Sequence, residues 1–582
     1  MSVKDNLANL EWLRKEIIGR NFLFSTPYGK RPLVYADYTA SGRGLFFIEN
    51  YLMHLLKYYA NTHTEDDFTG KTMTRLLHEA EKKIKNSVNA GDHGKIIFTG
   101  TGATGGITRL QQILGVYWSP ATHQRIDSFL ESCKRNSKNA KCNHALFEYI
   151  KANEPIVFVS PYEHHSNEIM WRQTLCDVVE VPFGHDDKLD LEKLEKMVSD
   201  PKYANRDKIG SFSAASNVSG LRTPVYEVAR ILHRNNAIAC FDFAACAPYV
   251  EIDMNKDKES YFDAIFLSPH KFLGGPGSSG ILVFNEKLYP KDLPPCVAAG
   301  GTVDYVSEEE ELYIDDIETR EKPGTPGIIQ AIKTSLVFQL KDKIGSDRIE
   351  EIEAFYLRKF YEKFEKETKI VFYGPRKPED KINIIPFNIR FKDRYLHPKF
   401  VTKLLNDLFG VQTRAGCSCA GPYGHKLLNI DTQTSLKYND FLKEKHYGGI
   451  KPGWVRLNIH YTFSQEEFDY IVNAIKFVIK HGYKFLPYYR FCLKTGEWTN
   501  LEDKGHPREV ALEIDTVRGL DTYKQDEYNH DSPDYKKIME SNHEIVSKLE
   551  KDLDFIKFES DLEKLMFFHV CNLQKVQEKF EN

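Results

Sequence analysis

Between residues 95 and 284, short apolar runs alternate with longer helical or loop segments. The runs are rich in β-branched and aromatic residues and are flanked by glycine, proline or polar clusters, as is typical of buried strands. They are Ile96–Phe98, Ile156–Val159, Val178–Val181, Ile238–Phe241, Ile265–Leu267 and Ile281–Phe284. Strands that alternate with helices predict an α/β fold with a mostly parallel, doubly wound sheet and helices on both of its faces.

The pattern changes after about residue 330, where strand-like and helical segments predict a smaller α+β unit. Ser464 and Glu467 fit a capping box, and Gly482 fits the glycine that ends a helix at C′. The segments are strand-like Ile382–Ile389, helical Pro398–Leu408, strand-like Trp454–Tyr461 and helical Glu466–His481.

Both ends of the chain extend beyond these two patterns. A helical pattern at Leu7–Ile18 begins an entry segment, and Ser532-Pro533 fits an N-cap followed by proline at the first helical position. Apolar residues after this N-cap recur at roughly helical spacing, so we expect amphipathic helices docked on the body. These residues are Ile538, Ile545, Leu549, Leu553, Ile556, Leu562, Leu565, Leu573 and Val576.

These changes predict four parts in a chain of 582 residues, which is several times the length of one typical domain. An entry segment spans 1–60, and a large domain spans 61–330 with a polar surface excursion at 119–153. A small α+β domain spans 331–486. An acidic, mainly helical extension spans 487–582.

Composition narrows the class of protein. The 79 Lys and Arg against 83 Asp and Glu give a net charge of −4, which does not favour nucleic-acid binding. The acidic excess is local, because 501–582 carries 20 acidic against 12 basic residues. The sequence contains no run of ~18 apolar residues that would cross a membrane. Ten cysteines without repeated spacing are typical of free thiols, and the first 24 residues lack a leader pattern, so we predict a cytoplasmic protein.

One lysine stands out between two apolar runs. Lys271 follows Ser268 and His270 and precedes the glycine-rich stretch Gly274–Gly280. A lysine at a strand-to-loop edge can form a Schiff base if its surroundings keep it partly deprotonated. The alternative is a surface lysine in a glycine-rich hairpin.

A glycine-rich turn, Gly100–Gly105, follows the first apolar run and satisfies G-x-G-x-x-G. A dinucleotide site would also need an acidic residue ~20 positions on, and the stretch Trp118–Pro120 supplies none. Backbone amides at a helix N-terminus, together with the hydroxyl of Thr104, can instead hold a phosphate. A plain tight turn is the remaining alternative.

Two further motifs follow apolar runs and therefore lie at the carboxyl ends of strands, where open α/β sheets collect ligands. His164, in Glu163–Asn167, can stack on a planar ring and move protons, although a surface histidine or a metal half-site is an alternative. Asp242 ends a buried run and needs a partner, which a protonated pyridine nitrogen would provide. A carboxylate that caps a turn is the alternative for Asp242.

A loop of small residues, Arg414–Pro422, carries an arginine and two thiols. Arginine suits bidentate capture of a substrate carboxylate. A thiol of Cys417 or Cys419 can act as a nucleophile if neighbouring cations lower its pKa. The alternatives are a zinc half-site with His425, which lacks a second ligand pair, and a strained disulfide.

Together, these motifs resemble the class V aminotransferase family of pyridoxal-phosphate (PLP) enzymes, closest to the cysteine desulfurase and selenocysteine lyase branch. The resemblance runs from about Tyr35 to Gly482. It implies the type I PLP transferase fold, PLP as the cofactor, no metal, and a homodimer.

The resemblance also implies roles for single residues. Lys271 would hold the PLP aldehyde, with Ser268, His270, Ala103 and Thr104 at the phosphate, His164 stacked on the ring, Asn217 beside the ring hydroxyl, Asp242 at the ring nitrogen, and Thr302 reaching the phosphate of a partner subunit.

Arg414 would bind the substrate carboxylate, and Cys419 would form a persulfide. The implied reaction removes sulfur from L-cysteine, or selenium from selenocysteine, to give alanine, and passes the sulfur to an acceptor protein. Two positions depart from the family pattern, because Ala245 stands where the family places Gln and Cys417-Ser418 stands where the branch favours histidines. The alternatives are another class V lyase, epimerase or aminotransferase acting on a different amino acid, and a catalytically silent scaffold.

Overall fold

A computed structural model describes residues 10–62, 64–136, 149, 152–417, 419–503, 505, 533–549 and 553–572. The chain forms two compact units. The central unit is Ser41–Glu350, and the terminal unit joins Met1–Ala40 to Glu351–Asn582. The predicted four-part division stays a prediction.

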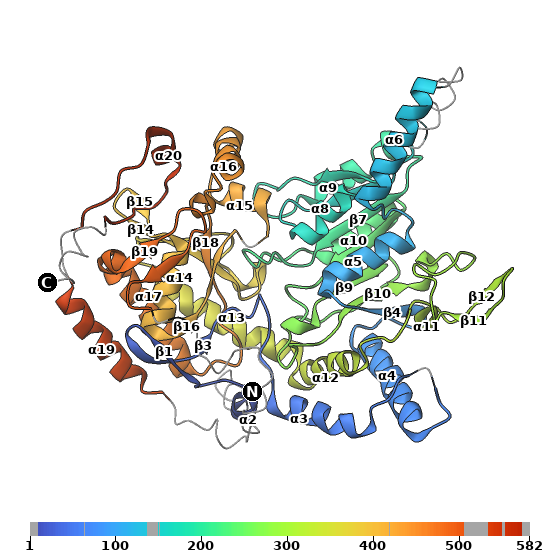
Figure 1. The fold of residues 1–582 in the computed structure, drawn as a ribbon, viewed down its shortest axis with the longest axis horizontal. Coiled ribbons are helices and arrows are strands. Elements are labelled where there is room, and N and C mark those ends of the chain that lie inside the picture. The colour runs from blue at the N-terminus through green and yellow to red at the C-terminus, as the bar shows by residue number, and fades with distance from the viewer. Residues whose placement is uncertain are drawn as a thin grey trace. The chain divides into compact units, whose positions relative to one another are not determined.

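A seven-stranded sheet forms the centre of the central unit (Figure 1). Strand β10 runs antiparallel to β4 and β9, and the other strand pairs in this sheet are parallel. The predicted mostly parallel α/β sheet is therefore confirmed. In spatial order the strands are β4 (Gly94–Thr99), β10 (Gly280–Asn285), β9 (Ala264–Leu267), β8 (Ala237–Asp242), β7 (Lys208–Ser213), β5 (Ile156–Val159) and β6 (Asp177–Glu180).

Strand β7 was not among the predicted strands, although it lies between β5 and β8. Its sequence, Lys-Ile-Gly-Ser-Phe-Ser, is small and polar, so it lacks the apolar run that marks a buried strand. The small residues are required by packing. A Cβ at Gly210 would lie 2.3 Å from Cδ1 of Leu232 on α10 (Val225–Arg234), which covers this face of the sheet.

The opposite face of the sheet packs against α5, α8 and α11. Ile107, Leu110 and Ile113 of α5 share one core with Trp171 of α8 and Ile317 of α11. Figure 1 also shows α12 running beside α4, and α6 extending away from the sheet. The remaining helices of this unit, with bounds, are α3 (Phe46–Leu55), α4 (Phe68–Ser87), α5 (Gly102–Ile113), α6 (Pro120–Asn136), α8 (Ile169–Arg172), α9 (Leu191–Val198), α11 (Ile317–Arg320) and α12 (Ile328–Ile344).

Helix α6 occupies the first part of the predicted excursion at 119–153, and its side chains at 120–129 are exposed. Most of the rest of that excursion, 137–148 and 150–151, lies outside the described residues. A hairpin of β11 (Val303–Val306) and β12 (Glu311–Tyr313) completes the unit.

The terminal unit contains an antiparallel sheet in the order β13-β14-β18-β17, which agrees with the predicted α+β pattern after 330. The N-terminal segment belongs to this unit because β3 pairs with β16 in parallel. The strands are β1 (Leu23–Thr26), β2 (Gly29–Pro32), β3 (Val34–Tyr35), β13 (Ile370–Phe372), β14 (Ile385–Phe391), β15 (Arg394–Tyr395), β16 (Val411–Gln412), β17 (Arg414–Gly416), β18 (Trp454–Leu457), β19 (Tyr489–Phe491) and β20 (Trp498–Asn500).

In the terminal unit, helix α2 forms part of the predicted N-terminal helix. The predicted residues before Leu10 lie outside the described residues. The helices are α2 (Glu11–Glu16), α14 (Pro398–Phe409), α15 (Gly421–Leu427), α16 (Thr432–Glu444), α17 (Gln465–His481), α19 (Tyr535–Lys548) and α20 (Ser560–Leu565), and α13 (Ser346–Lys363) begins in the central unit.

The predicted capping box is present at the start of α17, where Ser464 accepts from the backbone of Glu467 and Glu467 accepts from that of Ser464. The helix α17 ends directly before Gly482, as predicted, but Gly482 is not the predicted C′ glycine. Its φ of −55° and ψ of −37° continue a right-handed turn into a 3₁₀ helix, Gly482–Tyr488, instead of a left-handed stop. Glycine is needed there for space, since a Cβ would lie 2.9 Å from Cγ1 of Val478.

The C-terminal extension contains the predicted amphipathic helix, as α19. The predicted cap at Ser532, with Pro533 at the first helical position, is wrong, because the N-cap is Asp534, whose side chain accepts from the backbone N–H of Lys537. Asn542 is fully buried and anchors the helix, because its Nδ2 donates to the carbonyl of Leu408 (2.7 Å). Further along, α20 buries Leu562 and Leu565, whereas the predicted positions Leu573 and Val576 lie outside the described residues.

Lys381 of the terminal unit is 1% exposed, and its Nζ donates to the hydroxyl of Tyr361 (2.9 Å). Burial, aided by the charge of Arg376, lowers the pKa of Lys381 to about 7. An unfolded lysine titrates near pH 10.4, so the unfolded chain binds more protons from pH 7 to 10.4, and stability from this group rises with pH over that window.

We therefore expect the wild-type chain to gain about 2 kcal/mol relative to Lys381→Met between pH 7 and pH 9, measured by urea unfolding of the full chain. Lys363→Met, at an exposed lysine of α13, the helix that carries Tyr361, should follow the wild type. Equal pH dependence in wild type and Lys381→Met would contradict the lowered pKa.

Among the described residues, no helix is long and apolar enough to cross a membrane.

Candidate active site

The carboxyl ends of β4, β5, β7, β8 and β9 lie along one edge of the central sheet. The pairing places Ser213 at the end of β7 beside Asp242 at the end of β8, and Asp242 beside Phe266 near the end of β9. Each predicted site motif of this unit up to Lys271 follows or ends one of these strands. The topology therefore gathers these motifs at one edge, where open α/β sheets bind ligands.

The glycine-rich turn after β4 contacts the Ser268 loop after β9. The backbone N–H of Ala103 donates to Oγ of Ser268 (2.9 Å). Gly102 has a φ of +61°, and a Cβ there would lie 2.7 Å from that Oγ, so both its conformation and its surroundings require glycine. Since Ser268 accepts a bond from Ala103, its own hydroxyl proton stays available to a ligand.

His270 is held by the start of the central unit. Its Nδ1 lies 3.2 Å from Oγ of Ser41, and its carbonyl accepts from the backbone N–H of Gly42 (2.9 Å). Burial and the charge of Lys271 lower the pKa of His270 to about 4. At neutral pH the imidazole is therefore uncharged, and it can donate to an anion through a single ring N–H.

Lys271 ends a short 3₁₀ turn, Pro269–Lys271. The backbone of Gly275 packs closely against this turn. A Cβ at Gly275 would lie 2.1 Å from the carbonyl oxygen of Pro269, which fixes the path of the loop. The positive charge of Lys271 adds to the effect of burial in lowering the pKa of His270 and partly opposes the effect of burial in raising the pKa of Asp242, so the three groups share one electrostatic environment.

Asp242 is 5% exposed, and its Oδ1 accepts from the backbone N–H of Ala244 (2.8 Å). Burial raises the pKa of Asp242, and the Ala244 bond and the charge of Lys271 oppose this shift. A carboxylate that is removed from water in this way is stabilised by a cationic N–H donor. Cys246, four residues on, is a buried thiol whose pKa burial raises to about 12, so it stays protonated.

His164 caps the 3₁₀ turn η2 (His165–Asn167) after β5, and its Nδ1 accepts from the backbone N–H of Ser166 (3.1 Å). This bond places the proton of a neutral imidazole on Nε2. The side chain is partly exposed at the sheet edge, as the predicted ring-stacking role requires.

Glu163, which precedes His164, joins the ends of β5 and β7, and sequence analysis assigned it no role. Its carboxylate accepts from the backbone N–H of Ser160 (3.1 Å), from Nδ2 of Asn167 (2.8 Å), and from the N–H and Oγ of Ser213 (2.9 and 2.5 Å). Burial raises the pKa of Glu163 to about 7, although these bonds favour the anion.

Thr104 also has a neighbour that sequence analysis did not assign. Its Oγ1 lies 2.8 Å from Oγ of Ser166, on the turn that carries His164. The available signal was a hydroxyl residue two positions after a histidine at a strand end, which is too common a pattern to select Ser166.

Asn217 and Thr302 are both buried. Asn217 lies in a tight turn closed by the bond from the N–H of Ser216 to the carbonyl of Leu221 (2.8 Å). The hydroxyl of Thr302 donates to the carbonyl of Ala299 (2.7 Å), within its own turn.

Arg414 and Cys419 belong to the terminal unit. Arg414 is exposed on β17, in register with the buried Arg456 of β18, which pairs with Asp37 (2.7 Å). Within the described part of the chain, Arg414 forms no ion pair. Cys417 and Cys419 are exposed free thiols, and Cys419 has a φ of +58°. No group of three or more His, Cys, Asp or Glu among the described residues is arranged to hold a metal ion.

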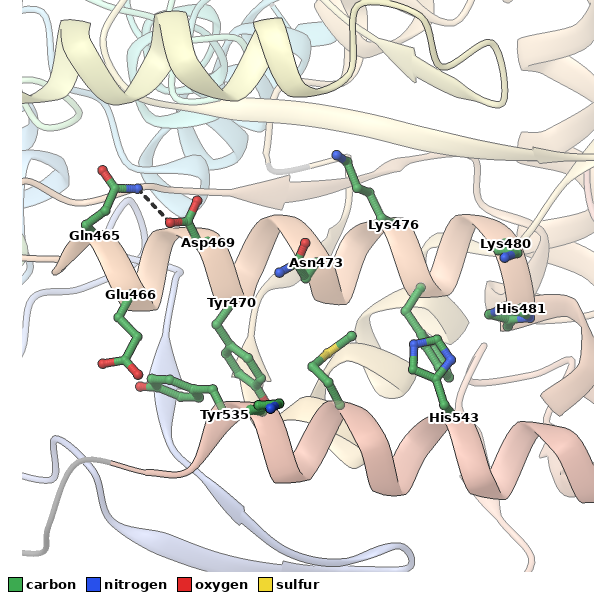
Figure 2. Close-up of a pocket in the computed structure, with 13 residues that line it drawn as sticks. Gln465, Glu466, Asp469, Tyr470, Asn473, Lys476, Lys480, His481, Tyr535 and His543 are labelled. Carbon is green, nitrogen blue, oxygen red and sulfur yellow. Dashed lines mark hydrogen bonds between the residues drawn. The ribbon is translucent and has the colours of Figure 1, made fainter.

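A pocket of about 860 Å³ lies elsewhere in the terminal unit, between α17 and α19 (Figure 2). The rings of Tyr470, Phe477 and Tyr535 line it, with His481 and His543 at one end. None of the predicted site residues lines this pocket.

The groups at the sheet edge fit PLP by their chemistry. The hydroxyls of Ser268 and Thr104, the imidazole of His270 and the N-terminus of α5 suit a phosphate dianion. The buried carboxylate of Asp242 suits a protonated ring nitrogen, and the amine of Lys271 suits an aldehyde. The chemistry of the donor set therefore matches the cofactor that the resemblance implies.

The fold is the type I fold of PLP-dependent transferases, as predicted. Solved cysteine desulfurases superpose on it. One, from Thermococcus onnurineus NA1 in its apo form, gives a TM-score of 0.60 at 23% identity and covers 77% of this chain and 95% of its own. Another, CsdA from Escherichia coli, gives 0.58 at 18% identity and covers 81% and 98%. At these identities the likeness shows the fold alone.

The chain belongs to the aminotransferase class-V family, whose model matches residues 133–470. The predicted resemblance is thereby confirmed. Members of this family and its cysteine desulfurases are PLP-dependent enzymes. Curated relatives include a "probable cysteine desulfurase" from Halalkalibacterium halodurans, 28% identical over 396 residues, which are 67% of this chain and 85% of the relative. One of the same name from Staphylococcus aureus is 27% identical over 453 residues, which are 77% and 92%.

Proposed function

We propose that this protein is a PLP-dependent cysteine desulfurase that takes sulfur from L-cysteine, or selenium from selenocysteine, and leaves alanine. The observation that carries the proposal is the placement of Asp242 at the end of β8 and of Lys271 just after the neighbouring strand β9, at one carboxyl edge of the central sheet. An amine and a buried carboxylate in that relation are the minimum that PLP chemistry on an amino acid requires. The names of the curated relatives support the substrate.

When bound, PLP supplies an electron sink for bonds at the α-carbon of an amino acid. Ser268, Thr104, His270 and the N–H groups at the start of α5 hold its phosphate. Asp242, which accepts from the backbone N–H of Ala244, keeps its second oxygen for the ring nitrogen.

The remaining residues of the central site act beside the ring. His164, with its proton on Nε2, would stack on the ring, and Asn217 would bind beside the ring hydroxyl, as the family resemblance implies. The amine of Lys271 removes the proton from the α-carbon of the substrate and returns a proton to carbon later.

The family resemblance assigns the roles that act on the substrate to two residues of the terminal unit. The guanidinium of Arg414 binds the substrate carboxylate in a bidentate manner. The thiolate of Cys419 forms a bond to the substrate sulfur as the carbon–sulfur bond breaks, and the bonding electron pair stays on carbon. Protonation of this β-carbon and return of a proton to the α-carbon would give alanine, while the proton of the substrate thiol passes to solvent. Cys419 would keep one extra sulfur as a persulfide, which an acceptor thiol then removes.

We also propose a homodimer, in which Thr302 contributes to the phosphate site of the second copy. A sulfur-acceptor protein and a cytoplasmic location complete the proposal. They follow from the family resemblance and from the composition of the chain.

The test is the exposure of the PLP-loaded full chain to L-cysteine, followed by peptide mass spectrometry and an assay for alanine. We expect one added sulfur atom on Cys419 in the wild type and in Cys417→Ser, and none in Cys419→Ser. Alanine formation should accompany the modification.

Two other outcomes separate the alternatives. Alanine formation without a persulfide in Cys419→Ser would leave a PLP enzyme in which both cysteines are bystanders, such as a lyase. Turnover of another amino acid but not of cysteine would favour an epimerase or aminotransferase. PLP binding without any turnover would favour a silent scaffold.

A further inference from the structure

The turn after β5 approaches the start of α5 through a pair of hydroxyls. Oγ of Ser166 lies 2.8 Å from Oγ1 of Thr104, the third residue of α5. Thr104 is exposed and Ser166 partly exposed, so the pair faces the sheet edge and is not sealed in the core. The N-terminus of α5 offers backbone N–H groups at the same place.

Buried bonds hold Ser166 in position from both sides. Glu163 binds the ends of β5 and β7, as described above. Asn167, directly after Ser166, is fully buried and donates through Nδ2 to Glu163 (2.8 Å) and to the carbonyl of Ser211 (3.1 Å). Its Oδ1 accepts from Nε1 of Trp171 (3.2 Å). These bonds fix the turn that carries Ser166 and so keep its backbone close to the start of α5.

The hydroxyl protons of Thr104 and Ser166 determine what this pair of residues can still bind. The backbone N–H of Ser166 is used by Nδ1 of His164. Two hydroxyls carry two protons, and their mutual bond uses one of them. The other O–H is therefore available to a third acceptor, and an anion near the start of α5 is the acceptor that the helix N-terminus also favours.

We propose that Ser166 is a further phosphate-binding residue, which completes the cradle formed by Thr104, Ser268 and His270. The inference rests on the proposed cofactor and assigns Ser166 to its phosphate. In this arrangement the turn of His164 holds the cofactor at two points. The imidazole contacts the ring, and the hydroxyl, two residues on, contacts the phosphate.

The test compares PLP with pyridoxal, which has the same ring and aldehyde but no phosphate. Both are titrated into cofactor-free full chain, with binding followed by absorbance. We expect Ser166→Ala to bind PLP roughly tenfold to a hundredfold more weakly than the wild type, as for the loss of one hydrogen bond to a charged group, and to bind pyridoxal equally well. Ser166→Thr, which keeps the hydroxyl, should recover most of the affinity for PLP.

Thr108→Val is the matched control, because the Thr108 hydroxyl donates to the carbonyl of Thr104 (3.0 Å) one turn along α5. This variant should bind both compounds as the wild type does. If Ser166→Ala weakened the binding of PLP and of pyridoxal equally, or left PLP binding unchanged, the proposed role of Ser166 would be overturned, but the rest of the phosphate site would stand. A wild-type chain that does not prefer PLP over pyridoxal would overturn the proposed phosphate site as well.

Discussion

Lys271→Ala should abolish covalent attachment of PLP and all turnover of L-cysteine. The lysine amine is the group at the sheet edge that can link to the cofactor aldehyde, and its charge acts on both Asp242 and His270. Alanine keeps the backbone of the 3₁₀ turn, so the phosphate cradle is expected to persist and bind PLP without the link. The loss of rate should exceed ~10⁴-fold, because the variant lacks both the link and the base.

The measurement is borohydride reduction of the PLP-loaded chain followed by mass spectrometry. The wild type should carry one phosphopyridoxyl group on the peptide that contains Lys271, and Lys271→Ala should carry none. Lys258→Ala, which removes an exposed lysine of the same unit, should label and turn over as the wild type does. Labelling of a different lysine in Lys271→Ala at the wild-type level would contradict the assignment.

The order of motifs along the chain was enough to predict their meeting point. Each predicted strand end carried a polar group, and parallel strands bring their carboxyl ends to one edge of a sheet. Asp242 and the Ser268–Lys271 loop could therefore be assigned to one site before any distance was known. The structure adds that Lys271 acts electrostatically on Asp242 and that Ala103 donates to Ser268.

The features that were not predicted from the sequence, strand β7 and the roles of Glu163 and Ser166, also have a physical explanation. Strand β7 is buried but small and polar, since Gly210 leaves space for Leu232, so no apolar run marks it. Glu163 and Ser166 gain their roles from contacts with β7 and α5, residues that lie ~50 and ~60 positions away in the chain. A short motif cannot contain such partners.

The end of α17 shows a second limit of prediction from the sequence. A glycine after a run of helical residues favours a left-handed stop, because glycine alone pays no steric penalty there. At Gly482 the missing side chain instead makes room for Val478, and the backbone stays right-handed. The same residue type serves either need, and only the surrounding packing distinguishes them.

Asp242→Asn should leave PLP attached to Lys271 but slow turnover by roughly 10²–10⁴-fold, the equivalent of losing ~3–5 kcal/mol from a broken buried charge pair. Asparagine has the same shape, and its Oδ1 can still accept from the N–H of Ala244, so the end of β8 should keep its structure. The lost element is the negative charge, which burial disfavours and which a protonated ring nitrogen would offset.

The two halves of this prediction are measured separately. Borohydride labelling of Lys271 reports attachment, and the rate of alanine formation reports turnover. Asp292→Asn, at an exposed aspartate of the same unit, is the control for the charge change and should behave as the wild type. If Asp242→Asn turned over cysteine at the wild-type rate, the buried carboxylate would be a structural cap for Ala244 and not the partner of the ring nitrogen. If it lost attachment as well, Asp242 would be needed to form the site, and the loss of rate could not be assigned to the ring nitrogen. Retained attachment with slowed turnover is the outcome specific to a carboxylate that keeps the ring nitrogen protonated.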